Sequence, residues 1–260
     1  MKAALTSLVR LVGLLLVSAL ALQLFFLARV GLMIAVDPQS TAFQRSEIWR
    51  IATQQGGLRW SQQWVAYDRI APSLKRAVIA SEDAGFAEHS GVEWDALEKA
   101  WERNQKAEAA AERLNQQAQR RSARPGRAVA STPARAAPKV VGGSTITQQL
   151  AKNLFLGGER SLGRKAQEFV ITGFLEALLT KERILEIYLN SVEWGEGVFG
   201  AEAASRHYFH LGAAALAPAQ AARLAVMLPA PKRFERRPAS PYVLGRAATV
   251  MARMSAVEVP

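Results

Sequence analysis

The sequence contains no cysteine and only three histidines among 260 residues. Without cysteine the chain can form neither disulfides nor thiolate-based catalytic or metal sites. No histidine cluster has metal-ligand spacing, and there is neither a phosphate-binding Walker loop nor a nucleophile elbow. These absences exclude the commonest zinc, nucleotide-hydrolysing and serine-hydrolase sites. Any divalent cation would have to be held by carboxylate and phosphate oxygens.

Acidic residues are too few to balance the basic ones, and the excess of positive charge is concentrated in two stretches of the chain. The formal net charge is +11. Residues 100–140 hold nine Lys and Arg against three Asp and Glu, and residues 231–260 hold six against two, while the rest is close to neutral. No base-stacking motif accompanies these charges, so no nucleic-acid partner is predicted. An anionic lipid surface is at least as good a match.

One long apolar segment lies near the N-terminus. Residues 11–36 are mostly apolar, with Gln23 as an uncharged polar exception and Arg29 as a charged one, and this length suffices for a helix across a bilayer core of about 30 Å. Lys2 and Arg10 precede the segment. This charge pattern predicts a transmembrane anchor at residues 11–36 with residues 1–10 in the cytoplasm.

A cleaved signal peptide is the alternative interpretation of this segment. Residues 19–21, Ala-Leu-Ala, resemble a small-x-small cleavage site. The apolar run continues past that site, which favours an uncleaved anchor. In both cases residues 37–260 are expected outside the cytoplasm.

Helical patterns dominate residues 37–260, and convincing period-2 strands are absent. Helices are expected from Pro72, from about Ser144 and from Pro218, and over about residues 164–190 with a break near Thr180. The sequence therefore predicts a mainly α fold. After Asp37-Pro38 we expect a polar connector that holds three tryptophans, Trp49, Trp60 and Trp64.

Residues 100–138 differ in composition from their surroundings and are interpreted as an inserted basic arm. Ala, Gln, Arg and Glu dominate up to about Arg121, so this half can extend a helix. The second half cannot hold a helix across Pro125, Pro133 and Pro138. We predict that it is partly disordered. The arm either binds anionic lipid or is a tolerated insertion without a role.

The first cluster of candidate functional residues is SEDAGFAEHSG, residues 81–91. Adjacent carboxylates at a helix end, beside an aromatic residue and a histidine, suit acid–base chemistry when burial raises the pKa of one carboxyl. A solvated helix end with a packed Phe/His pair is the alternative. The candidates here are Glu82, Asp83, Phe86 and His89.

The second cluster is GGSTITQQLAKN, residues 142–153. Thr145, Gln149 and Lys152 are spaced i, i+4 and i+7, which places them on one helix face. A glycine-led helix start at Ser144 offers free N–H groups and a positive dipole end, which is a site for phosphate. A capped surface helix is the alternative.

The third cluster contains Arg164, Lys165 and Glu168. Spacings of i,i+4 and i,i+3 bring both cations next to the carboxylate. Taken alone, this pattern also fits an ordinary surface salt bridge worth under about 1 kcal/mol. The following segment KERILEIYLN, residues 181–190, is interpreted as mainly structural.

The order of these clusters resembles glycosyltransferase family 51, the peptidoglycan glycosyltransferases. The motifs that carry the resemblance span about residues 64–235, and they are EDxxFxxHxG, GGSTITQQxxKN, RKxxE, KxRILExYLN and GxxGxxxAxxxYF. With 260 residues there is no room for a transpeptidase domain, so the chain resembles the monofunctional biosynthetic form. The arm makes the gap between the first two motifs longer than the family usually shows.

The resemblance implies a mainly α, lysozyme-like domain of two lobes at residues 37–260, beside the bacterial inner membrane. The donor would be a growing glycan on undecaprenyl pyrophosphate and the acceptor lipid II. Glu82 would be the general base, removing the proton from the acceptor 4-hydroxyl as it attacks the donor anomeric carbon with inversion. Glu168 would be the second essential carboxylate, orienting basic residues or holding a divalent cation such as Mg²⁺. Substrate contacts are expected from Asp83, Phe86, His89, Ser144, Thr145, Gln149, Lys152, Asn153, Arg164 and Lys165.

Two other functions remain as alternatives. A lysozyme-like hydrolase that cuts the same polymer would also use two carboxylates, but it has no phosphate to bind. A membrane-tethered scaffold without activity would have no need of Glu82 and Glu168. Other cell-wall synthesis proteins are expected partners of the biosynthetic enzyme.

Overall fold

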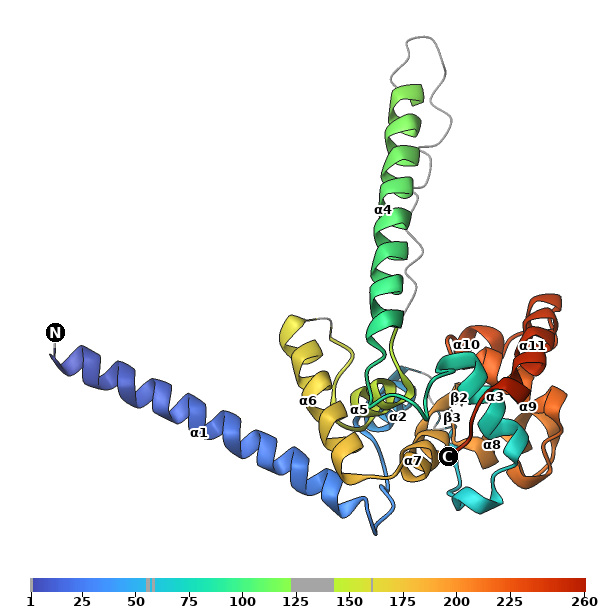
Figure 1. Cartoon of the computed structure of the whole chain (residues 1–260), viewed down its shortest axis with the longest axis horizontal. Helices are drawn as coiled ribbons and strands as arrows, with labels where there is room; N and C mark the ends of the chain where they lie inside the picture. The colour runs from blue at the N-terminus through green and yellow to red at the C-terminus, as the bar shows by residue number, and fades with distance from the viewer. Residues whose placement is uncertain (1, 55–56, 58, 123–142, 160) are drawn as a thin grey trace. The chain divides into compact units, whose positions relative to one another are not determined.

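The computed structural model describes residues 2–54, 57, 59–122, 143–159 and 161–260 (Figure 1). The chain divides into two compact units. The first comprises Met1–Val92 and Thr145–Pro260, and the second is Glu93–Ser144. The prediction of a mainly α fold is confirmed, while the two-lobed, lysozyme-like arrangement stays a prediction.

The helices of the first unit form two packed groups. In one group α6 (Leu162–Leu178) and α7 (Lys181–Ser191) pack on α5 (Ile146–Phe155), together with α1 (Lys2–Leu32) and α2 (Ala42–Gln54). In the other group α3 (Pro72–Glu82) and α11 (Pro241–Arg253) pack on α9 (Pro218–Met227). Beside this group, α8 (Ala201–Phe209) packs on β3 and α10 (Pro231–Phe234) on β2. Short 3₁₀ turns lie at Tyr67–Arg69, Ala213–Ala215 and Met254–Ala256. Buried side chains from both groups form one hydrophobic core.

Three short strands form a sheet that the sequence pattern did not predict. β1 (Ser61–Gln62) pairs in parallel with β3 (Val198–Phe199), which pairs antiparallel with β2 (Glu193–Gly195). Strands of two or three residues are too short to show a period-2 pattern. At Gly197, with φ 72°, an added Cβ would lie 2.1 Å from the carbonyl oxygen of Arg59, so glycine is required there.

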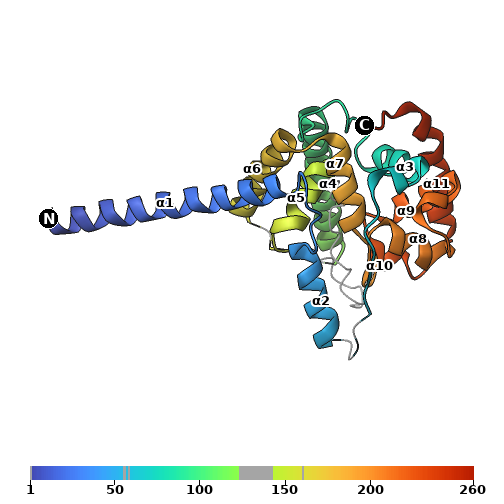
Figure 2. The ribbon, with the colours of Figure 1, turned by 90° about the horizontal axis from the view of Figure 1, so that it is seen from below.

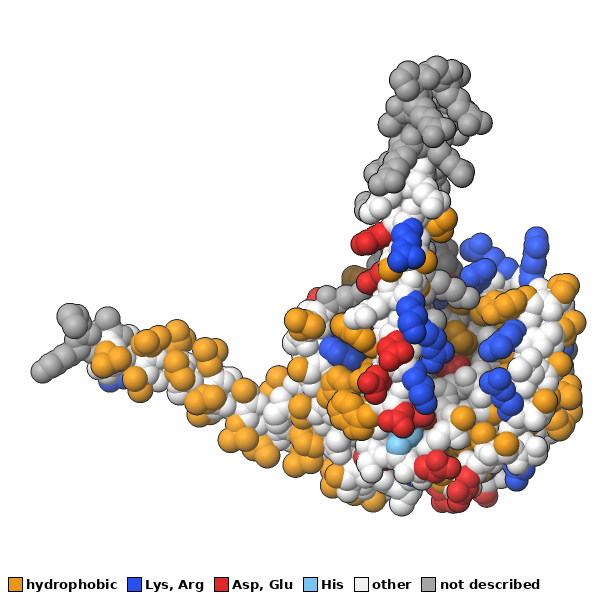
Figure 3. Space-filling view, turned by 45° about the horizontal axis from the view of Figure 1, so that its top comes forward, with side chains coloured by type: hydrophobic (Ala, Val, Ile, Leu, Met, Phe, Trp, Pro, Cys, Tyr) orange, Lys and Arg blue, Asp and Glu red, His pale blue; other side chains and the backbone are white. Residues whose placement is uncertain are grey.

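The segment predicted as an anchor, residues 11–36, lies mostly within one helix, α1. This helix begins nearer the N-terminus than expected and ends at Leu32 instead of residue 36. Residues Leu5–Leu32 are long and apolar enough to cross a membrane. Hydrophobic side chains cover this helix along its length (Figure 3).

Only the C-terminal end of α1 packs against the rest of the unit, beside α6 (Figure 2). Phe26 packs edge-on against Phe155 at 5.3 Å, and Val30 and Met33 are buried. Gln23, the uncharged polar exception in the apolar segment, exchanges amide hydrogen bonds of 2.8 and 2.9 Å with Gln167 of α6. The C-terminal end of α1 is therefore part of the hydrophobic core.

The predicted polar connector after Asp37-Pro38 is wrong over residues 42–54, which form α2. The Thr41 hydroxyl accepts from the Gln44 N–H at 3.0 Å, while the Gln44 side chain accepts from the Thr41 N–H at 2.8 Å. This reciprocal pair is a capping box, and its T-x-x-Q signature is present in the sequence. Trp49 lies on α2 and is 74% exposed, whereas Trp60 stacks on Phe199.

The second unit consists mainly of α4 (Trp94–Ser122). Its bounds confirm that the first half of the basic arm is helical. An i,i+4 ion pair joins Lys106 and Glu102 at 3.6 Å between exposed side chains, so it contributes little stability. The proline-rich half of the arm, residues 123–138, lies outside the described residues.

Candidate active site

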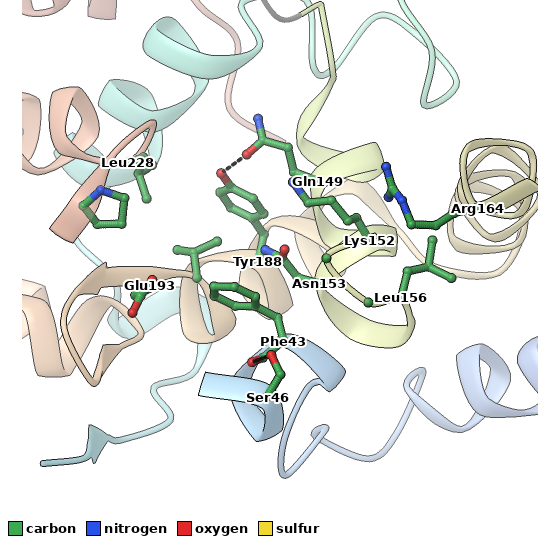
Figure 4. A pocket seen from close by; sticks show the side chains of 14 residues that line it. Phe43, Ser46, Gln149, Lys152, Asn153, Leu156, Arg164, Tyr188, Glu193 and Leu228 are labelled. Atoms are coloured by element: carbon green, nitrogen blue, oxygen red, sulfur yellow. Dashed lines mark hydrogen bonds between the residues drawn. The ribbon is translucent and has the colours of Figure 1, made fainter. Parts of the chain in front are cut away.

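A cavity of about 420 Å³ opens between the two helix groups of the first unit (Figure 4). Four of the predicted substrate-binding residues line it, namely Gln149, Lys152, Asn153 and Arg164. The other lining residues come from α2, the α5–α6 loop, α7, β2 and the α9–α10 region: Phe43, Ser46, Leu156, Gly157, Gly158, Tyr188, Val192, Glu193, Leu228 and Pro231. The sequence clusters thus meet at one hollow, although they are far apart along the chain.

Glu82 reaches this cavity through Gln149. Its Oε2 accepts a hydrogen bond from Gln149 Nε2 at 3.1 Å, and Gln149 Oε1 accepts from the Tyr188 hydroxyl at 2.9 Å. Burial raises the pKa of Glu82, with Asp83 adding to the increase, while hydrogen bonds from Gln149 and Ser81 oppose it. A half-buried carboxyl with a raised pKa and a fixed orientation suits a general base.

The other three residues of the first cluster build the loop after α3 and do not line the cavity. Asp83 is buried, and its Oδ1 lies 2.8 Å from His89 Nε2. His89 Nδ1 accepts from the Gly91 N–H at 3.1 Å, so Nε2 carries the proton toward Asp83. Phe86 is fully buried beneath the ammonium of Lys181. Asp83, Phe86 and His89 therefore support the loop that follows Glu82, and their contact with substrate stays a prediction.

At the start of α5, where the sequence predicts a phosphate site, the N–H groups of Ile146 and Gln148 already have partners within the chain, and phosphate binding there stays a prediction. Asp83 Oδ2 accepts from the Ile146 N–H at 2.9 Å, and the Thr145 hydroxyl accepts from the Gln148 N–H while donating to the Gly91 carbonyl at 2.6 Å. A carboxylate and a capping box thus occupy the helix N-terminus, which favours negative charge. Thr145 is buried in this cap and does not contact the cavity. Ser144 is exposed and belongs to the second unit, so its contact with substrate stays a prediction.

The cationic side of the cavity lies at the opposite end of α5 and at the start of α6. Lys152 and Arg164 line it together. Desolvation by the cavity walls lowers the pKa of Lys152, Glu168 opposes this shift, and the charges of Arg164 and Lys165 add to it. Three neighbouring cations repel one another, and an anionic ligand between them would relieve that repulsion.

Glu168 is the carboxylate that holds these cations in place. It is only 3% exposed. Its Oε2 accepts from Arg164 Nη1 at 3.1 Å, and its Oε1 pairs with Lys165 Nζ. In the salt bridge considered from the sequence, the carboxylate is therefore buried while both cations reach solvent, and burial of Glu168 makes the pairing geometry important. Glu168 and Lys165 do not line the cavity, so they act on it through Arg164 and Lys152.

The residues around Glu168 do not fit a resident metal ion. Both carboxylate oxygens already pair with cationic groups of the chain. A divalent cation at this carboxylate would face the charges of Arg164, Lys165 and Lys152. Glu168 accordingly orients Arg164 and Lys165 on the cationic side of the cavity.

Several cavity residues were missed by sequence reasoning. Tyr188 was assigned to the apolar face of a structural helix, yet its hydroxyl orients Gln149. Burial raises its pKa well above the usual value, so it remains a neutral donor. Phe43 and Ser46 lie on the unpredicted α2, whose capping box was the available signal. Nothing in the local sequence marked Glu193, because only the tertiary structure brings it to the cavity.

Comparison with known proteins places the chain in a family. A family model described as Transglycosylase matches residues 50–121 and 122–255. The chain is 48% identical over 242 residues to the biosynthetic peptidoglycan transglycosylase of Burkholderia thailandensis, covering 93% of this chain and 83% of that protein. Proteins of the same name from Paraburkholderia xenovorans and Bordetella pertussis are 47% and 48% identical over 242 residues, covering 93% of this chain and 88% and 90% of theirs. The chain therefore belongs to the transglycosylase family.

Proposed function

We propose that this protein polymerises peptidoglycan glycan strands, transferring a growing chain from undecaprenyl pyrophosphate to the 4-hydroxyl of lipid II. The observation that carries the proposal is a cavity with Lys152 and Arg164 in one wall and the Glu82–Gln149 pair at its edge. A transferase with a pyrophosphate leaving group needs both a base and a cationic site.

The proposed reaction assigns one role to each side of the cavity. The acceptor 4-hydroxyl attacks the anomeric carbon of the donor, and its proton passes to Glu82. The bond from that carbon to the phosphate oxygen breaks, and the centre inverts. Lys152 and Arg164 stabilise the charge on the departing lipid pyrophosphate, and Glu168 keeps Arg164 and Lys165 oriented.

The N-terminal helix supports a membrane location for this chemistry. With one apolar helix of sufficient length at Leu5–Leu32, we propose a single-pass protein of the inner membrane. Lys2 and Arg10 favour a cytoplasmic N-terminus and a periplasmic catalytic domain. Protease treatment of spheroplasts tests the orientation, because an epitope placed after Pro260 should be digested without lysis. A protected epitope would contradict it.

Turnover of purified full-length protein in detergent tests the activity. With lipid II as substrate we expect long glycan strands that a muramidase cuts to disaccharide units. The same preparation is incubated with finished peptidoglycan, from which no soluble fragments are expected. Fragments from the finished polymer would instead indicate a hydrolase, and no reaction with either substrate would indicate a scaffold.

A further inference from the structure

Glu193 is an acidic residue that lines the cavity of the candidate active site, and the proposed reaction does not use it. It begins β2 and lines the cavity across from Lys152 (Figure 4). The residue is only 7% exposed. One carboxyl oxygen, Oε1, is buried without a hydrogen-bond partner among the residues that the structure describes. A buried carboxyl oxygen without a hydrogen bond calls for a chemical explanation.

The charged groups that face Glu193 do not fully balance it. Lys232 Nζ of α10 lies 3.5 Å from Glu193 Oε1 but also pairs with Glu47 of α2. Arg50 is engaged by Glu47 and by Glu196. One lysine is thus shared by two carboxyl groups, with Glu196 as a third acid nearby. Tyr208 of α8 and Glu235 are further titratable groups on this side, since both Glu193 and Glu235 act on the Tyr208 hydroxyl.

This environment favours the neutral form of the Glu193 carboxyl. Burial raises its pKa to about 7, Glu47 and Glu196 add to the increase, and Lys232 opposes it. A neutral carboxylic acid can both donate and accept hydrogen bonds, as a sugar hydroxyl or acetamide requires. The ionised form could only accept, and it would repel a phosphate bound to Lys152 and Arg164 in the same cavity.

The apolar side chains near Glu193 are also suited to a sugar ligand. Phe43, Leu228 and Pro231 line the cavity, and Figure 4 shows Phe43 and Leu228 on the side of Glu193. Apolar and aromatic groups beside a few polar ones are typical of pockets that fix the orientation of a ligand. The cavity therefore has a cationic wall for the pyrophosphate and a largely uncharged wall for the adjoining saccharide.

We propose that Glu193, in its protonated form, binds the saccharide part of the lipid-linked donor and makes donor binding weaken as the pH rises. The proposal rests on the proposed function above. Because Glu193 acts in binding, the Michaelis constant KM changes with its protonation, while kcat at saturation does not. Glu82 acts in the opposite direction, since kcat increases with pH as the base loses its proton.

The experiment measures KM and kcat for lipid II from pH 6 to pH 8 with full-length protein in detergent. If only the protonated form binds, a group with a pKa of about 7 raises KM about tenfold over this range. Glu193→Gln keeps the shape and stays neutral, so its KM should remain nearly constant. Glu193→Ala should have a raised KM at every pH. Glu88→Gln, an exposed glutamate outside the cavity, is the matched control and should follow the wild type.

A second variant tests the charge network without altering Glu193. Lys232→Met removes the group that lowers the pKa of Glu193, so the increase in KM should move to higher pH. Thermal unfolding of each variant checks that it is folded. A wild-type KM independent of pH, or the same increase in Glu193→Gln, overturns the proposal. Absence of polymer from wild-type protein at every pH would instead reject the proposed function.

Discussion

Glu82 at the end of α3 and Glu168 near the start of α6 are both shielded glutamates, but their surroundings differ. Neutral donors surround Glu82, with Gln149 as its direct partner and Tyr188 behind it. Glu168 is held by two cations, Arg164 and Lys165. With an amide as its partner, Glu82 keeps a raised pKa and a lone pair that can accept a proton. At Glu168, by contrast, two ion pairs occupy both carboxylate oxygens. Environment, not residue type, separates the proposed base from the positioning residue.

Removing the proposed base should have the largest effect. Glu82→Gln preserves shape and keeps the Gln149 contact within reach, but the amide cannot accept the acceptor's proton. We expect kcat on lipid II to fall about 10²–10⁴-fold. Glu88→Gln on the same loop should retain wild-type activity. Activity of Glu82→Gln within about threefold of wild type would refute the assignment.

The Glu82→Gln variant should also change the pH dependence of thermal stability. Because the pKa of Glu82 is raised in the folded state, stability is greatest below the unfolded value of 4.5 and decreases as pH rises through the folded pKa. Glu82→Gln should therefore have a higher Tm than wild type at pH 7.5 and no advantage at pH 4. Each 1 kcal/mol corresponds to about 2–4 °C for a domain of this size. Equal Tm values at pH 7.5 would contradict the burial argument.

Replacing the positioning carboxylate should cost less activity but more stability. Glu168→Gln leaves Arg164 and Lys165 without their counter-charge, so we expect at least a tenfold loss of kcat/KM. The free energy of unfolding should fall by about 1–2 kcal/mol, below the 3–5 kcal/mol of fully buried pairs, because both cations reach solvent. Glu202→Gln removes the buried carboxylate of a Glu–Arg pair on α8 whose arginine is exposed, away from the cavity. This control should lose stability and retain activity, and equal activity losses in both variants would indicate a general folding effect.

Shortening the anchor should have a smaller effect that depends on the substrate's environment. Deleting residues 1–22 keeps the Gln23–Gln167 pair and the buried end of α1. This variant should turn over detergent-solubilised lipid II normally but work several-fold more slowly on liposomes, because the anchor confines enzyme and substrate to one surface. Equal rates on liposomes would exclude that role.

A longer deletion, of residues 1–36, separates anchoring from packing. It also removes Phe26, Val30 and Met33 from the core. Each such side chain contributes about 1.5–3 kcal/mol when fully buried. The longer deletion should therefore unfold at a clearly lower temperature than the shorter one in thermal melts.

The smallest effect is expected for Tyr188, whose hydroxyl donates a hydrogen bond to Gln149 next to Glu82. Tyr188→Phe removes one hydrogen bond, worth about 0.5–1.5 kcal/mol, and releases Gln149 from its fixed orientation. The Gln149 contact lowers the pKa of Glu82, so loosening it should move the acidic limb of the kcat profile to higher pH. We expect a loss below tenfold at pH 7 that recovers at higher pH. An unchanged profile would show that Tyr188 does not tune the base.

Sequence patterns were sufficient for the helices that have strong local signals. Pro72 and Pro218 begin α3 and α9 as predicted, and Thr180 separates α6 from α7. Proline at the first helical turn and a threonine cap act within a few residues, so they can be read without the fold. The capping box of α2 is equally local and could have been recognised.

Tertiary structure decided which of the motif residues face the cavity. The sequence itself placed Gln149 and Lys152 on one face of a helix, and both line the hollow. It could not show that Asp83 would occupy the start of α5, because that bond joins residues 63 positions apart. It could not place Glu193 beside Lys232 for the same reason. Periodicity and caps depend on neighbours along the chain, whereas burial and charge pairing depend on which distant segments pack together.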